Sequence, residues 1–251
     1  MTVTIYMFLF LLGHALGDFY LQSKRTVKKK EQTALFVVIH AAAYTICFTV
    51  LLLVVCQMNL ALFWLLLLIF STHTIIDLAK RSAEKASHIP LLSKQSPQEY
   101  LFFIDQGLHI GSLILLSFLF YTQLTPRLWF VELHPIEMGW GVHPVILLMA
   151  FVYIIKPASM VIEKILNICN ILPTIDTGFV NGGKIIGILE RLLILFLLLL
   201  GQFSTIGLVI AAKSLARFRD LDDRKCAEYY IIGTFLSLVS VGAVALITII
   251  N

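Results

Sequence analysis

Apolar residues in this chain fall in blocks of about 20 residues, the length that a helix needs to cross the hydrocarbon core of a bilayer. Of the 251 residues, 59% are apolar and 14% are charged, whereas a soluble domain has about 45–50% apolar and about 25% charged residues. The blocks show no period-two alternation, so they do not resemble barrel strands, and helices are the remaining way to satisfy backbone groups in lipid. The sequence therefore predicts an all-α, polytopic transmembrane helix bundle.

The apolar blocks predict about seven spans. These lie at residues 3–21, 33–56, 60–79, 99–121, 143–160, 192–212 and 229–250. The first block lacks a basic n-region and carries His14 and Asp18, so we expect a retained span rather than a secretory peptide. We expect three parts: a four-span bundle at 1–122, an external loop at 123–142, and carboxy-terminal spans at 143–251 with a charged hairpin at 213–228.

Basic residues gather in the connections 23–32 and 80–98, whereas 122–142 contains Arg127 as its single lysine or arginine. The positive-inside rule then places the amino terminus outside and the two basic connections in the cytoplasm. Seven spans from this start would put the basic hairpin 213–228 outside, against the same rule. Either 161–191 contains a re-entrant or extra crossing, or the acidic residues of the hairpin neutralise it.

The first four expected spans contain three aspartates, and each lies four residues from a histidine. The pairs are His14–Asp18, His73–Asp77 and Asp105–His109, and the second span adds His40. Residues at i and i+4 share one helix face. The order of the pair inverts in the span that runs away from a basic connection, so every aspartate is nearer the basic face. A common depth is what a single site requires, and we expect these side chains to converge.

Seven candidate ligands are more than one tetrahedral zinc ion needs, so two carboxylate-bridged ions are also expected to fit. Nitrogen and oxygen donors without thiolate suit zinc, manganese or iron. The sequence predicts one or two divalent ions, zinc first, with some of the seven residues orienting the ligands. Two alternatives remain open: a proton or cation pathway, and a polar network that holds the helices together.

These motifs carry a family resemblance. The stretches that carry it are residues 14–22, His40, residues 73–80 and residues 105–109. They resemble an uncharacterised family, a domain of unknown function, of polytopic inner-membrane proteins from bacteria and phages with HxxxDF and HxxxD motifs. The stretches 187–191, 211–218 and 228–229 are similar to its longer members. The resemblance implies a bacterial cytoplasmic membrane and no established activity. A weaker, motif-level likeness to membrane-bound metal-dependent hydrolases implies hydrolysis by analogy.

Three functions fit these residues. The first is a hydrolase in which metal-bound water attacks an anionic or lipid-linked ester or pyrophosphate at the cytoplasmic leaflet, with Asp18 or Asp77 as the catalytic base. Residues expected to draw the anion are Lys24, Arg25, Lys80 and Arg81. The second is a divalent cation or proton transporter, although the apolar outer halves of the first four spans favour a one-sided pocket. The third is a non-enzymatic membrane effector or partner-docking module.

Lys213 and Arg217 share one helix face near the end of the sixth expected span. They are expected either to snorkel to the interface or to contact anionic lipid headgroups or another anion. Glu228 begins the last span and is expected to pair with one of them across the hairpin. Membrane lipids are expected partners, no nucleic-acid partner is evident, and the sequence does not indicate an oligomeric state.

Overall fold

The computed structural model describes residues 3–23, 26–27, 29–30, 33–87, 97–133, 136–137, 141–169, 182–216 and 224–250. The chain forms two compact units, Met1–Leu133 and His134–Asn251. The predicted all-α fold is confirmed: the strands of the described residues are one antiparallel pair, β1 (Ile136–Glu137) and β2 (Gly141–Val142). The expected external loop, 123–142, is thus divided between the two units.

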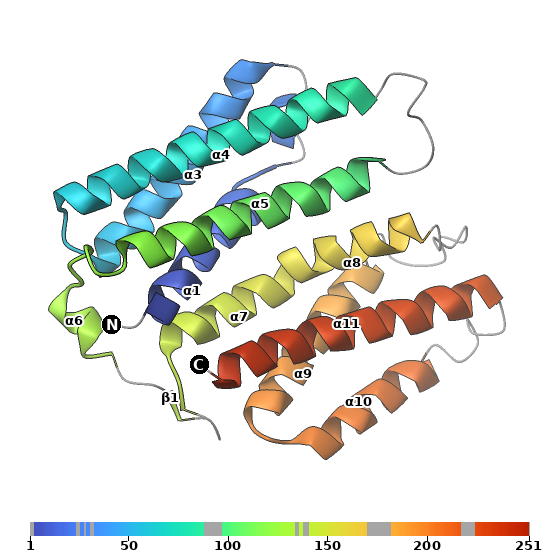
Figure 1. The fold of residues 1–251 in the computed structure, drawn as a ribbon. Helices are drawn as coiled ribbons and strands as arrows, with labels where there is room; N and C mark the ends of the chain where they lie inside the picture. The colour runs from blue at the N-terminus through green and yellow to red at the C-terminus, as the bar shows by residue number, and fades with distance from the viewer. Residues whose placement is uncertain are drawn as a thin grey trace. The chain divides into compact units, whose positions relative to one another are not determined.

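Unit 1 is a four-helix bundle (Figure 1). Its elements are α1 (Val3–His14), which continues as the π-helix η1 (Ala15–Tyr20), α3 (Ala34–Val55), α4 (Leu60–Ser87), α5 (Pro97–Phe120) and the short α6 (Leu128–Val131). α1 contacts α3 and α5, and α4 contacts the same two helices, so the four helices close a ring around a shared core. Functional side chains on their inner faces are therefore brought together.

The end of this bundle is tied by backbone hydrogen bonds between two connections. Gln57 N donates to the Thr125 carbonyl, and Arg127 N donates to the Val55 carbonyl, both at 2.8 Å. The Arg127 side chain adds a bond from Nε to the Leu53 carbonyl at 3.0 Å. The two bonds from Arg127 satisfy carbonyls that the end of α3 leaves without an intrahelical partner. The segment after α5 therefore belongs to unit 1.

Unit 2 is a second helical bundle. Its helices are α7 (Pro144–Ile155), α8 (Pro157–Ile168), α9 (Gly182–Leu199), α10 (Phe203–Ala216) and α11 (Arg224–Ile250). Pro157 has no N–H group, and the α7 helix is interrupted just before it, at Lys156. α11 contacts α7, α8 and α9, whereas α10 packs on α9 and buries none of its own residues.

Six helical stretches of the described residues are long and apolar enough to cross a membrane, rather than about seven. They are Val3–Tyr20, Ala34–Val55, Leu60–Lys85, Glu99–Phe120, Pro144–Ile168 and Arg224–Ile250. The predicted span 192–212 is wrong, because α9 ends at Leu199 and α10 begins at Phe203. Gly201 has φ of 71°, and Gln202 N donates to the Leu197 carbonyl at 2.8 Å. This Schellman ending terminates α9.

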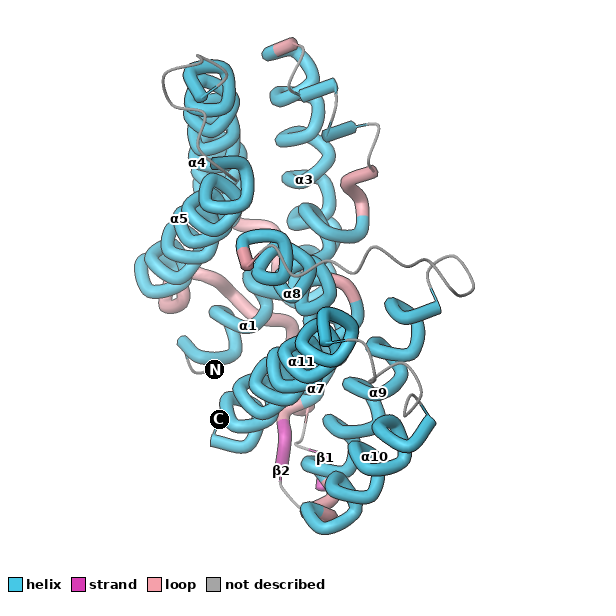
Figure 2. The backbone as a smooth tube through the Cα atoms, turned by 90° about the vertical axis from the view of Figure 1, so that its right-hand side faces the viewer, coloured by secondary structure: helices cyan, strands magenta, loops and turns pink. Residues whose placement is uncertain are grey.

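α9 and α10 consequently form a hairpin, and Figure 2 shows them side by side. The 14 residues of α10 extend about 21 Å at 1.5 Å per residue, which is shorter than a hydrocarbon core of about 30 Å. The start of α9 and the end of α10 lie at the same end of the hairpin. The re-entrant or extra crossing expected as one alternative was placed at 161–191, whereas this hairpin spans 182–216, and residues 170–181 lie outside the described residues.

Candidate metal centre

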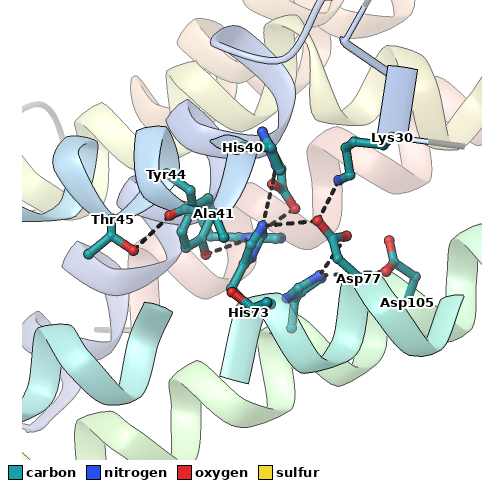
Figure 3. A network of polar contacts seen from close by, with 12 residues as sticks. Lys30, His40, Ala41, Tyr44, Thr45, His73, Asp77 and Asp105 are labelled. Atoms are coloured by element: carbon teal, nitrogen blue, oxygen red, sulfur yellow. Dashed lines mark hydrogen bonds and ion pairs between the residues drawn. The ribbon is translucent and has the colours of Figure 1, made fainter. Parts of the chain in front are cut away.

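Seven side chains of the histidine–aspartate motif meet inside unit 1, and every helix of the bundle contributes. Figure 3 labels four of them, His40, His73, Asp77 and Asp105. They are His14 from α1, Asp18 from η1, His40 from α3, His73 and Asp77 from α4, and Asp105 and His109 from α5. Six of them are at most 4% exposed, and the Asp18 side chain is 8% exposed. Nitrogen–oxygen distances between them are 3.1 to 3.8 Å. The predicted convergence of these residues is confirmed.

Asp18 joins histidines from three helices. His40 Nε2 donates to Asp18 Oδ1 at 3.1 Å, and His73 Nε2 lies 3.6 Å from the same oxygen. The other oxygen, Oδ2, lies 3.6 Å from His14 Nδ1. Asp18 sits in the π-helix, whose wide turn is closed by Leu21 N donating to the Leu16 carbonyl at 2.9 Å. Single π-helical turns within α-helices often mark functional sites.

Asp77 lies between the histidines of two helices. Its Oδ2 is 3.5 Å from His73 Nε2, and its Oδ1 is 3.8 Å from His109 Nε2. His109 Nε2 is also 3.5 Å from Asp105 Oδ1. Three overlapping groups have ligand atoms within 4.8 Å of one another: Asp18–His73–His109, His40–His73–Asp77 and Asp77–Asp105–His109. Shared members of these groups could bridge two ions.

Several buried nitrogen and oxygen atoms of this centre, all able to bind a metal ion, have no hydrogen-bond partner among the described residues. They are Nδ1 and Nε2 of His73, Nε2 of His109 and Oδ1 of Asp105. Leaving such an atom unsatisfied costs about 1–3 kcal/mol. The separations of 3.5–3.8 Å are longer than a hydrogen bond of about 3.2 Å. Two atoms bound to one tetrahedral ion at about 2.0–2.2 Å lie about 3.3–3.6 Å apart. The residues therefore fit a divalent metal.

Two residues that the sequence reasoning missed hold the imidazole of His14. Its Nδ1 accepts from the Tyr44 hydroxyl at 3.1 Å, and its Nε2 donates to Gln106 Oε1 at 3.2 Å. Gln106 Nε2 then donates to Asp105 Oδ2 at 3.1 Å, and the Tyr44 ring stacks on His73 with centroids 3.8 Å apart. Both ring nitrogens of His14 are thus occupied, which suits an orienting role. Tyr44 lies four residues after His40 of α3, and this spacing, which places both on one helix face, is the sequence feature that indicates its role.

Two glycines let η1 and α1 approach α3 closely. A Cβ atom on Gly13 would lie 2.8 Å from Cζ of Phe48, and one on Gly17 would collide with the Tyr44 ring. Gly13 and Gly17 form a GxxxG pattern, which permits close contact between helices in membranes. This approach brings the His14–Asp18 turn against the ring of Tyr44, and the GxxxG pattern is visible in the sequence.

Aromatic side chains close the centre on the side away from the aspartates. The Phe48 ring lies 5.0 Å from that of Tyr44 and 6.2 Å from that of Phe10, measured between centroids. All three residues are at most 1% exposed. In Figure 3, Tyr44 and Lys30 lie on opposite sides of His40 and Asp77. On this side the centre is therefore covered by buried aromatic rings.

Two lysines reach the carboxylates from the other side. Lys30 Nζ lies 2.5 Å from Asp77 Oδ2, and Lys80 Nζ lies 2.9 Å from Asp105 Oδ2. Lys80 was expected to contact an anion, and here it pairs with a candidate ligand. Lys30 was not among the expected site residues, because nothing in a basic connection distinguishes one lysine from the next. The other expected anion contacts are Arg81, which is partly exposed, and Lys24 and Arg25, which lie outside the described residues.

Unit 2 contains a separate ion pair, between the buried carboxylate of Glu190 on α9 and the partly exposed Lys213 on α10. The expected pairing of Glu228 with Lys213 is wrong, since Glu228 instead accepts from Arg224 Nε at 2.9 Å on the exposed start of α11. The α9–α10 hairpin explains the difference, because it brings the side chain of Lys213 against the middle of α9. Arg217, the other expected anion contact, lies outside the described residues.

Arg191, next to Glu190, forms hydrogen bonds on both sides of the interruption between α7 and α8. Its guanidinium donates to the Ile154 carbonyl at 3.2 Å, to Ser159 Oγ at 2.5 Å and to Ser237 Oγ at 3.4 Å. The side chain is buried, and these acceptors come from α7, α8 and α11. Arg191 therefore joins groups on both sides of the interruption to α11.

Comparison with known proteins found one match. The model of a family described as a protein of unknown function (DUF3307) matches residues 6–136, which include all seven histidine and aspartate residues. No curated protein and no solved structure matches the chain. The expected likeness of the carboxy-terminal stretches lies beyond the matched residues and stays a prediction.

Proposed function

The chain belongs to the DUF3307 family of proteins of unknown function, and from this premise we propose that it is an integral membrane metalloprotein. The observation that carries the proposal is a cluster of buried imidazole and carboxylate atoms 3.5–3.8 Å apart. Of these residues, His73 (Nδ1 and Nε2), His109 (Nε2) and Asp105 (Oδ1) have atoms without a hydrogen bond among the described residues. Imidazole and carboxylate donors suit zinc first, with manganese or iron as alternatives. One or two ions fit the seven residues.

The overlapping groups suggest how two ions would be held. One would be bound by His40, His73 and Asp77, and the other by Asp77, Asp105 and His109. Asp77 belongs to both groups, and its two oxygens face different histidines. Asp18, which accepts from His40 Nε2 at 3.1 Å, lies beside the first group.

We further propose that the activity is hydrolysis of an anionic or lipid-linked ester or pyrophosphate at the cytoplasmic leaflet. A bound divalent metal would supply a water molecule whose proton is lost near neutral pH. Asp18 or Asp77 would then accept a proton from that water as the general base, depending on which carboxylate is not used as a ligand. Basic residues at the pocket mouth, Lys80 and Arg81 with Lys24 and Arg25, would attract the substrate.

Transport of a divalent cation or of protons is the second candidate, since intramembrane histidines and aspartates also form such pathways. A pathway needs polar groups through both halves of the bundle. The buried rings of Phe10, Tyr44 and Phe48 occupy the half beyond the histidines. This covering of aromatic rings supports a site that opens on one side, and therefore supports hydrolysis over transport.

The hydrolase hypothesis is tested with purified protein that is stripped of metal and reloaded with zinc or manganese. The probes are inorganic pyrophosphate, bis(4-nitrophenyl) phosphate and phosphatidate in mixed micelles. We expect metal-dependent turnover of at least one probe and a loss of about 100-fold or more in Asp77→Asn. Glu228→Gln, the same acid-to-amide change on an exposed helix start, should keep the wild-type rate. Metal-loaded protein that turns over no probe but moves ions across vesicles would support transport. Protein that shows neither turnover nor ion movement would support the third candidate, a partner-docking module.

The orientation is also a proposal, for a chain in the bacterial cytoplasmic membrane. Reporters placed in 23–32 and 88–96 should be cytoplasmic, and one placed in 122–133 should be external, because lysine and arginine gather in the first two connections. The α9–α10 hairpin returns the chain to the end at which α9 begins, so a reporter between Ala216 and Arg224 should also be cytoplasmic. An external reporter at 23–32 would reverse this orientation without affecting the clustering of the site.

A further inference from the structure

Lys30 and Lys80 occupy the carboxylates that the proposed metal ions need. Lys30 Nζ is 2.5 Å from Asp77 Oδ2, the oxygen that also faces His73 Nε2 at 3.5 Å. Lys80 Nζ is 2.9 Å from Asp105 Oδ2. The lysine side chains are 14% and 26% exposed, whereas the two aspartates are 3% and 4% exposed. Each ammonium group thus reaches inward from the rim to a buried carboxylate.

The immediate surroundings hold Lys30 beside the motif that carries Asp18. With its amide turned so that both ends are satisfied, Gln22 accepts from Lys30 Nζ and donates to the Asp18 carbonyl, each at 3.1 Å. The neighbouring Lys29 points elsewhere, with its Nζ 4.8 Å from the centroid of the Phe36 ring. The position of Lys30, and not its charge alone, therefore gives it the contact with Asp77. Lys29 carries the same charge without this contact and serves as a control.

An ammonium group and a divalent ion compete for one carboxylate, because the two cations repel each other at short range. With neutral imidazoles, three carboxylates and two ammonium groups leave the centre with a net charge of −1. Two divalent ions would add four positive charges and bring this to +3. A centre of that charge, buried among apolar helices, requires an anion or the withdrawal of the lysines.

We propose that Lys30 and Lys80 are exchangeable counter-ions of the centre. They neutralise Asp77 and Asp105 until metal binds, and they then bind a phosphate group held beside the metal. This inference rests on the proposed metal site. It couples the two ligands: metal binding frees two cations for the anion, and by linkage the anion strengthens metal binding.

The test measures zinc affinity by competition with a chromogenic chelator in metal-free protein. The variants are Lys30→Met, Lys80→Met and both together, with Lys29→Met and the exposed Lys85→Met as controls. Each site variant should bind zinc about tenfold more tightly than its control, because a competing cation is gone. Lys30→Gln and Lys80→Gln keep a hydrogen-bond donor for the aspartate and serve if the methionine variants do not fold.

The anion is tested in the same titration. Inorganic phosphate should raise the zinc affinity of wild-type protein about fivefold or more, and the double variant should lose this effect. Repeating the zinc titration in phosphatidylcholine vesicles with and without phosphatidate distinguishes a lipid headgroup from free phosphate. A rise in zinc affinity with phosphatidate or with inorganic phosphate supports the proposal. Zinc binding that the site variants leave unchanged or weaken, relative to the controls, would overturn the exchange. Wild-type protein that binds no divalent metal would instead overturn the proposed function itself.

Discussion

Asp77→Asn should lower the affinity of unit 1 for divalent metal by about 100-fold or more, because it removes an anionic oxygen that both proposed ion positions share. The amide keeps the size of the side chain and part of its hydrogen bonding, so the protein should stay folded in detergent. His73→Ala should have a similar effect through loss of an imidazole, and chelation of wild-type protein should mimic both. Elemental analysis beside a thermal melt checks these results.

Glu228→Gln is the matched control, since it makes the same chemical change on an exposed side chain of unit 2. Its metal content should equal that of wild-type protein. A structural network predicts a different result: no stoichiometric metal in wild type, and lower stability in both site variants because a buried partner is left unpaired. A proton relay predicts normal folding, no metal, and a loss that appears only under a pH gradient. Well-folded wild-type protein that stays metal-free after growth with zinc, manganese and iron would end the metal hypothesis.

Glu190→Gln should lower the free energy of unfolding of unit 2 by about 1–3 kcal/mol, because it removes the carboxylate that pairs with the Lys213 ammonium, whose side chain is 18% exposed. Lys213→Met should cost a similar amount by isolating the carboxylate. The double variant should recover most of the loss, since replacing both members of a buried ion pair is often close to neutral. Unfolding in mixed micelles with increasing denaturing detergent measures these differences.

The exposed pair Arg224–Glu228 is the internal comparison for this experiment, with side chains 92% and 50% exposed. Glu228→Gln should change the free energy of unfolding by about 0–1 kcal/mol, as is usual for exposed pairs. A double variant of Glu190 and Lys213 that is as unstable as the worse single variant would contradict the ion pair. The loss would then come from packing at the hairpin rather than from an uncompensated charge.

The sequence alone determined the helical membrane fold and the convergence of the histidines and aspartates. Both follow from one physical constraint, the high free energy of a charge or an unpaired backbone group in lipid. Because of it, three aspartates near one end of their spans must face inward and find partners, and the order of each pair with its histidine shows their common depth. The spacing of four positions between His73 and Asp77 suffices to place both on one helix face.

Tertiary structure decided the remaining features. Gly201 was visible in the sequence, but an isolated glycine in an apolar run does not show whether a helix continues or reverses, and here it ends α9. Which lysine of a basic connection reaches Asp77, and that Lys213 pairs with Glu190 rather than Glu228, depend on how helices rotate and pack against each other. These are contacts between residues at least 23 positions apart, and local spacing carries no information about them.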